Sequence, residues 1–435
     1  MPKPDPAAVA VSASQARLAL AVLLGVFVIN HADRQLLVIL LEPMRLELGL
    51  SDADLGFLTG FAFALFYAVA GIPLARLADR SSRRMIIAFG LAAWSFATAA
   101  QALVQSFWQL ALARVSVGVG EATTSPSAHS LIADLFAPAR RATALAVFTL
   151  GGHLGMWIGM AAGGWLVERI PWRATFLVVG LPGILLALLV PRLLPEPTRG
   201  RLEGQADTGE LPGIAEVARH LLSLPSFRHL CLAASLYVLA AFGFNIWGPQ
   251  LLQRLHGMGS GATGVSFGAV TGIFGALGTL LGGALVDRFV ARDARYALWI
   301  PALGGVAMIP FALAFLYAES PAVALTVYAP QVFVGTLYMG PMYALVQGLA
   351  KLRMRAQASA LLLVLINVLG MGLGPWFVGL LSDALRETRG DLGLRDAMLC
   401  LPAAALLGSV HSLLAARTLR HDLAHSSATG TVFTS

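Results

Sequence analysis

The chain has 435 residues, of which 57% are hydrophobic and only 12% are charged. A soluble globular protein carries about 25% charged residues, so this composition excludes a surface that faces water throughout and favours one that faces lipid. The formal net charge of +7 does not indicate a nucleic-acid partner, because the arginines stand in short clusters between apolar runs and form no basic stripe.

A helix needs about 20 apolar residues to cross a bilayer. On this scale the sequence predicts an all-α integral membrane protein with twelve spans in two pseudo-symmetric six-helix bundles. The first six predicted spans cover 18–40, 54–75, 84–105, 107–131, 141–167 and 173–190. The other six cover 229–252, 264–286, 296–317, 321–348, 356–382 and 397–416.

The predicted organisation has five parts in chain order. They are an N-terminal tail (1–17), a first bundle (18–190), a linker (191–227), a second bundle (228–417) and a C-terminal tail (418–435). Prolines, glycines and a charge cluster mark the linker, which could carry a short surface helix.

The distribution of basic residues predicts the orientation, because cytoplasmic loops of membrane proteins are rich in Lys and Arg. If both termini are inside, the inner turns hold the larger basic set, which outside the linker is Arg76, Arg80, Arg83, Arg84, Arg140, Arg141, Arg288, Arg292, Arg295, Lys351, Arg353 and Arg355. The outer side holds fewer basic residues. We therefore expect a protein of the cell inner membrane with both termini in the cytoplasm.

One motif occurs at the same turn of both predicted bundles. The second span ends in Ala75-Arg-Leu-Ala-Asp79-Arg80, and the eighth ends in Gly283-Ala-Leu-Val-Asp287-Arg288. The two aspartates lie almost half a chain length apart, which indicates an internal repeat. A carboxylate at this inner membrane surface could contact the positive end of a facing helix. A solvated turn with ordinary charge pairs is the alternative.

These segments resemble the GxLxDRxGRR signature of the major facilitator superfamily, with Ala75 and Ser82 in place of the glycines. Two further stretches resemble that family's fourth-helix and glycine-rich fifth-helix motifs: Arg114-Val-Ser-Val-Gly-Val-Gly-Glu121-Ala, and Gly151 to Gly164 without the usual proline. The resemblance covers nearly the whole chain. It implies a latch for the outward-open state, formed by Asp79, Arg80, Arg83, Arg84, Asp287 and Arg288. The second copy loses the pattern after Phe289.

Within the superfamily the chain resembles the Spinster group of lipid transporters. The stretches that carry this likeness are Asn30-His-Ala-Asp33-Arg34, Gly118-Val-Gly-Glu121-Ala and Leu131-Ile-Ala-Asp134-Leu-Phe-Ala-Pro138 with the Arg140-Arg141-Ala142 that follows. The resemblance implies export or flipping of lysophospholipid or sphingosine-phosphate-like lipids, coupled to protons. Organic-anion symporters share the Asp-Arg pair of the first helix.

Charged residues inside the predicted spans also require an explanation. A charge at the centre of a membrane helix costs about 2.5–3.5 kcal/mol on insertion scales, and such residues usually face a cavity and find partners. Asp33 and Arg114 both lie about 10 Å below the outer surface at 1.5 Å per residue. Glu121 lies about two turns deeper than Arg114 on nearly the same face. The sequence therefore predicts a charged cluster between the first and fourth spans.

We assign proton coupling to Asp33 and Glu121, and binding of an acidic headgroup to Arg114. When substrate occupies Arg114, the carboxylates lose their counterion and take up protons more readily. This competition is a sufficient basis for coupling lipid movement to protons. A purely structural salt bridge is the alternative. Arg34 remains open between a substrate contact and a structural role, because neighbouring residues on a helix do not share one face.

The remaining candidate substrate contacts are uncharged or only weakly basic. In the first bundle, His31 and His153 could relay protons or serve as hydrogen-bonded packing residues. The second bundle has no charge in mid-span, and its candidates are Asn245, Tyr338, Tyr343 and Asn367. Aromatic and Met side chains accompany these residues. An ionic first half with an apolar second half suits an amphiphile that has a charged head and an acyl tail.

The predicted function is therefore proton-coupled transport of an amphiphilic lipid by alternating access. The alternatives are a transporter of small organic anions, in which Arg114 binds a carboxylate, and a multidrug exporter. An enzyme is not expected, because the sequence contains no P-loop, no HExxH and no plausible nucleophile–base pair. Cys231 and Cys400 match no metal-ligand spacing. The expected partners are the lipid, protons and membrane lipids, with a monomeric protein and no cofactor besides the proton gradient.

Overall fold

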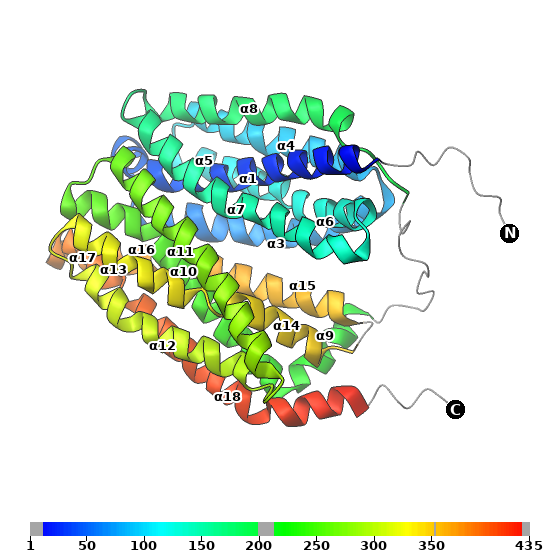
Figure 1. Cartoon of the computed structure of the whole chain (residues 1–435). Coiled ribbons are helices and arrows are strands. Elements are labelled where there is room, and N and C mark those ends of the chain that lie inside the picture. Colours follow the sequence, from blue (N-terminus) through cyan, green and yellow to red (C-terminus); the bar gives the residue numbers. More distant parts are fainter. Residues whose placement is uncertain (1–11, 199–212, 352–353, 429–435) are drawn as a thin grey trace. The chain divides into compact units, whose positions relative to one another are not determined.

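The computed structural model describes residues 12–198, 213–351 and 354–428, and every regular element within these ranges is a helix (Figure 1). Eleven of the described helical stretches are long and apolar enough to cross a membrane. The predicted fourth span is missing from that set because it is divided into α5 (Phe107–Glu121) and α6 (Thr124–Leu135). With this divided span included, the predicted all-α fold of twelve spans is confirmed.

The interruption between α5 and α6 has a local cause. Pro126 lacks the N–H that would bond the carbonyl of Ala122, and its ring would clash with that carbonyl in a continuous helix. Thr123 Oγ1 instead donates to the Gly120 carbonyl at 2.8 Å. The break therefore falls directly after Glu121, one of the charged residues singled out by the sequence.

The chain forms two compact units, the first comprising Met1–Leu40 and Phe66–Gly209 and the second Leu41–Leu65 and Glu210–Ser435. The outer end of the first span and the start of the second thus belong with the second unit, although the sequence analysis assigned them to the first bundle. Following the predicted orientation, we call the end that carries Leu48 and Asp52 the outer end.

The first unit contains most of α1 and α3 together with four complete spans. Its helices are α1 (Ala13–Leu48), α3 (Ala62–Arg80), α4 (Arg83–Ala100), η2 (Gln101–Leu103), α5, α6, α7 (Pro138–Val167) and α8 (Trp172–Leu193). α4 packs against both α5 and α8. This places the polar side chains of α4 between two neighbouring helices.

Glycines set the distance between α7 and α1. Gly151, Gly155 and Gly159 are four residues apart and therefore share one face of α7. A Cβ at Gly155 would collide with the carbonyl oxygen of Val28, and one at Gly159 with the carbonyl oxygen of Ala32. The glycine-rich stretch thus brings α7 against the backbone of α1 close to its charged residues.

The second unit contains the remaining helices. They are α2 (Asp52–Gly56), η1 (Phe57–Phe61), α9 (Ile214–Ser223), α10 (Pro225–His256), α11 (Ser260–Val290), α12 (Tyr296–Leu316), α13 (Pro321–Gly335), α14 (Met339–Leu349), α15 (Arg355–Leu365), η4 (Ile366–Gly372), α16 (Leu373–Arg389), α17 (Leu392–Ala397) and α18 (Cys400–Ala428). η1 and η4 are π-helical and continue directly into α3 and α16.

α10 forms the centre of packing in the second unit. It contacts α18, η4 and α16, and its buried Trp247 donates from the indole N–H to the Pro375 carbonyl at 2.9 Å. The short helix considered for the linker is present as α9, which buries Val217 and Leu221 and contacts α10 and α15.

Candidate functional site

The charged residues predicted from the sequence are brought together inside the first unit. Asp33 and Arg34 come from α1, and Arg114 and Glu121 come from α5. Asp33, Arg114 and Glu121 are 3%, 2% and 1% exposed. Arg114 interacts electrostatically with both carboxylates. We call these four residues the ionic cluster.

The ion pair within the ionic cluster involves Arg34. Arg34 Nε lies 2.6 Å from Glu121 Oε2 and joins α1 to α5, while its guanidinium stands 5.0 Å from the centroid of the Tyr67 ring. The sequence analysis had placed Asp33 and Arg114 at the same depth in one charged cluster and left the role of Arg34 open. A long arginine side chain can reach around the helix surface, so Arg34 can join Glu121 although Asp33 is its neighbour in sequence.

Asp33 has a partner that the sequence analysis missed. Thr98 Oγ1, on α4, donates to Asp33 Oδ2 at 2.6 Å. A threonine inside a span carries no distinguishing pattern, because its hydroxyl commonly bonds a carbonyl of its own helix, as Thr59 does with Leu55. The sequence indicated only that Thr98 is a polar residue inside a predicted span.

His31 and His153 lie near the contact between α1 and α7. His31 Nδ1 lies 3.2 Å from the Phe27 carbonyl oxygen, and its ring meets the Phe27 ring edge-on at 4.3 Å between centroids. A Cβ at Gly152 would touch the other edge of the His31 ring. His153, the next residue on α7, is half-buried. His31 is thus held by packing contacts directly beside the ionic cluster.

The inner turn after the second span is organised by Arg83. This guanidinium is 1% exposed and forms ion pairs with Asp134 and, at 2.8 Å, with Glu196. Nη1 also donates to Ser130 Oγ at 3.0 Å. Among the other predicted gating residues of the first unit, Arg80 is exposed, and the Asp79 side chain lies outside the described part of the structure.

Glu196 joins the start of the linker to this turn and was not predicted as a gating residue. It accepts hydrogen bonds from the Arg84 backbone N–H at 3.0 Å and from Ser82 Oγ at 2.7 Å. Partial burial raises the pKa of Glu196, but the hydrogen bonds from Arg83, Arg84 and Ser82 outweigh that effect and lower it. In the sequence, the two prolines on either side of Glu196, Pro195 and Pro197, were the feature that could have drawn attention to this residue.

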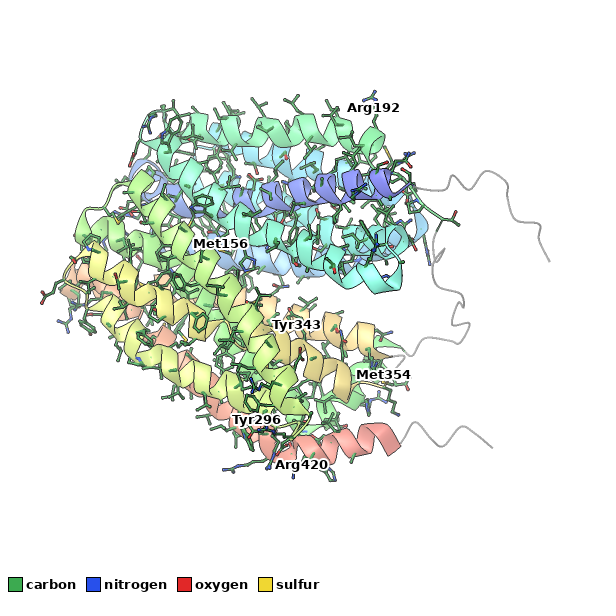
Figure 2. All side chains as sticks on the ribbon, in the orientation of Figure 1. Met156, Arg192, Tyr296, Tyr343, Met354 and Arg420 are labelled. Atoms are coloured by element: carbon green, nitrogen blue, oxygen red, sulfur yellow. The ribbon has the colours of Figure 1, made fainter. Side chains whose placement is uncertain are left out.

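The second copy of the motif is arranged differently. Asp287 and Arg288 are both exposed. The ion pairs near them use Asp293, which lies 2.8 Å from Arg295 and 2.7 Å from Arg420 of α18. Hydrogen bonds from Arg295 hold the pKa of Asp293 well below its usual range. Figure 2 shows Arg420 and Tyr296 at the same end of this unit.

The polar candidates of the second unit do not all share one site. Tyr338 is buried, and its ring lies 5.2 Å from that of Tyr237. The Tyr237 hydroxyl oxygen lies 3.3 Å from both Ser409 Oγ and Ser412 Oγ, within hydrogen-bond distance of each. Asn245 is buried on α10, Asn367 is half-buried in η4, and Tyr343 is half-buried on α14 (Figure 2). Tyr338 interacts electrostatically with both Tyr237 and Tyr343, so these three tyrosines lie close together.

The described residues contain no group of three or more His, Cys, Asp or Glu side chains that could hold a metal ion.

Residues 23–375 match the sequence pattern of the Major Facilitator Superfamily. The chain belongs to this superfamily.

Relatives of this major facilitator protein indicate which members of the superfamily it is similar to. An MFS-type efflux pump of Mycolicibacterium smegmatis is 35% identical over 410 residues, which cover 93% of this chain and 94% of that protein. Protein spinster homolog 1 of Homo sapiens is 28% identical, over 86% of this chain and 75% of that protein.

A solved structure gives the same assignment. The crystal structure of a bacterial homolog to the human lysosomal transporter Spinster, in an inward-facing and unoccupied conformation, superposes with a TM-score of 0.84 at 29% identity. It covers 94% of this chain and 99% of that one. The major facilitator chain is therefore a multi-pass membrane transporter of the Spinster group, as its first-span and fourth-span motifs predicted.

Proposed function

We propose that this transporter moves an amphiphilic lipid, of the lysophospholipid or sphingosine-phosphate-like class, by proton-coupled alternating access. It works as a monomer in the cell inner membrane with both termini in the cytoplasm. The observation that carries the proposal is the ionic cluster, in which Arg34 pairs with Glu121 beside the buried Arg114 and Asp33.

The chemistry of the ionic cluster supports this proposal in two steps. Breaking a buried ion pair without replacing a partner costs about 3–5 kcal/mol, so a cation and a carboxylate separate readily only when each gains a substitute. An acidic headgroup is a substitute partner for the arginines, and a proton neutralises Glu121. The binding of substrate and the binding of protons are then linked through the Arg34–Glu121 pair. Asp33, which accepts a hydrogen bond from Thr98, is the second carboxylate to which we assign proton coupling.

The second unit supplies a different environment. Its candidate contacts are the hydroxyl and amide groups of Asn245, Tyr338, Tyr343 and Asn367, which suit the uncharged part of an amphiphile. The resemblance to the Spinster group of lipid transporters, carried by the first-span and fourth-span motifs, favours a lipid. We assign the inner latch to Arg83 with Asp134 and Glu196, supported by Asp79, Arg80 and Arg84, and an auxiliary role to Asp287 and Arg288.

Export of amphiphilic drugs is the second candidate, and a specific finding favours it. The 35% identical relative from Mycolicibacterium smegmatis is an efflux pump. The ionic cluster contains two carboxylates, which could bind a cationic amphiphile after separation from the arginines.

The test is flux in proteoliposomes with an imposed pH gradient. A fluorescent lysophospholipid, a radiolabelled hexuronate and a cationic dye are offered separately. We expect lysolipid movement that depends on the gradient and is lost in Glu121→Gln. Transport of the dye but not of the lysolipid would favour the efflux pump, and transport of the hexuronate alone would favour an organic-anion transporter.

A further inference from the structure

The outer segment Leu41–Leu65 packs on α16 and η4 with backbone against backbone. A Cβ at Gly56 would collide with the Pro375 carbonyl, and one at Gly60 with the Gly372 carbonyl. From the opposite side, a Cβ at Gly379 would collide with the carbonyl of Asp52. Aromatic side chains add to this contact, because the Trp376 ring of α16 lies 5.7 Å from the Phe57 ring and 5.6 Å from the Phe61 ring of η1.

Arg254, near the end of α10, joins this segment through ion pairs. Nη1 and Nη2 donate to the two carboxylate oxygens of Asp52, both at 2.8 Å, in the bidentate geometry that favours Arg over Lys. Nε donates to Glu42 at 2.8 Å. Arg45 also pairs with Glu42, at 2.6 Å, but both of these residues belong to the outer segment itself.

α16 adds a second set of polar contacts to the same segment. The Asp383 carboxylate accepts the backbone N–H groups of Asp52 at 3.0 Å and of Ala53 at 2.8 Å. Ser382 Oγ donates to Asp52 at 2.7 Å. These N–H groups begin the helical run that continues through η1 into α3, and they have no partner within the helix. Asp383 supplies that partner from a different helix.

We propose that Arg254, Asp52 and Asp383 form an outer latch, which holds Leu41–Leu65 on α10 and α16 and is released each time the outer side opens. The inference rests on the proposed alternating access. Any motion that separates the segment from α10 and α16 must break the bidentate pair and both N–H contacts. Carboxylate and guanidinium groups are well hydrated, so water can replace these contacts when the site opens.

The second span connects this latch to the inner turn. Its outer end is held in the second unit through Asp52, and the turn after its inner end is held in the first unit through Arg83. One continuous helical run, from Asp52 to Arg80, thus lies between two ion-pair clusters in different units. Release of the outer latch frees this helix at one end only.

The latch can be tested by the accessibility of a buried reporter. Leu55 is fully buried, so Leu55→Cys, introduced with Cys231→Ala and Cys400→Ala in the full chain, should react slowly with a water-soluble maleimide. We expect Arg254→Ala and Asp383→Asn to raise this rate about tenfold or more, because each removes cross-helix bonds. Arg254→Lys should give an intermediate rate. The matched control is Arg45→Ala, which removes a cation that bonds only within the segment and should stay within about twofold.

Three outcomes would overturn the proposal. One is an unchanged rate in both Arg254→Ala and Asp383→Asn. Another is an equal rise in Arg45→Ala, which would indicate a general electrostatic effect. The third is a parallel rise at a second reporter, Leu298→Cys on α12, because these residues would then hold the whole second unit together. The labelling needs neither lipid nor a proton gradient, so its result is independent of the flux experiment on the proposed function.

Discussion

The two units place their charges in different environments. The first unit buries an ion pair between spans, Arg34–Glu121, and a second set around Arg83 at the inner turn. At its inner turn the second unit carries the Asp293–Arg420 pair instead, in which Arg420 is 63% exposed. Both inner pairs join a turn between spans to the end of a later helix, yet only one is removed from water. Burial, rather than the presence of an ion pair, should therefore decide which of the two inner turns depends on its charges.

The strongest test of this comparison is to remove one cation from each inner turn. Arg83→Ala leaves Asp134 and Glu196 without their shared partner, and the loss of one member of a buried pair costs about 3–5 kcal/mol. Arg420→Ala leaves Asp293 paired with Arg295, and an exposed pair contributes about 0–1 kcal/mol. Thermal unfolding in detergent should show a large loss of Tm for Arg83→Ala and little change for Arg420→Ala. Equal losses would contradict the comparison.

Substrate binding should show the next largest difference. We expect Arg114→Ala to weaken lysolipid binding by about tenfold or more, because a charge-assisted hydrogen bond contributes about 1.5–3 kcal/mol. Arg288→Ala, an exposed cation of the second unit, is the matched control and should bind as the unmodified protein does. Binding to the purified protein can be measured by tryptophan fluorescence. Unchanged affinity in Arg114→Ala would make its role structural.

The effect of substitutions on proton coupling should also differ between the two units. Glu121→Gln and Asp33→Asn each remove a titratable group of the ionic cluster, so the pH dependence of lysolipid flux should flatten in both. Asp287→Asn removes an exposed carboxylate and should leave the pH profile unchanged. The comparison requires flux at several values of internal pH. A full pH response in both cluster variants would leave the ionic cluster with a packing role alone.

The smallest expected effect concerns the linker contact at Glu196. Because the folded-state pKa of Glu196 is lowered, its stabilisation is present above the unfolded pKa and is lost as pH falls through the folded pKa. At pH 7 Glu196→Gln should therefore destabilise the first unit, by about 1 kcal/mol because Glu196 is partly exposed and its charge is screened by water, and the difference should vanish in acid. Thermal unfolding of both proteins across pH would show this. A difference that grows in acid would contradict the sign.

The sequence predicted the spans well because bilayer thickness dictates the length of an apolar run. It did not predict the interruption after Glu121, since Pro126 is compatible with a kinked helix as well as with a broken one. Nor did it assign Leu41–Leu65 to the second unit. That assignment depends on glycine contacts and on Arg254, whose partners lie far away in sequence.

Three residues of the ionic cluster could be identified from the sequence alone. A charge within a span is rare and costly, so Asp33, Arg114 and Glu121 stand out without any structure. Their pairing was not accessible, because it depends on how far an arginine side chain reaches around its helix. Hydroxyl partners such as Thr98, and the anchoring of Glu196, depend on which helices become neighbours.

The glycine face of α7 also limits how the first unit can move. At Gly155 and Gly159 the backbones of α7 and α1 meet directly, and the stacked rings of Phe27 and Phe148, 4.3 Å apart between centroids, join the same two helices. Rotation of α1 about its own axis would drive Val28 and Ala32 into α7. The direction in which Asp33 and Arg34 project is therefore set by α7, and we expect α1 and α7 to move together in the proposed alternating access.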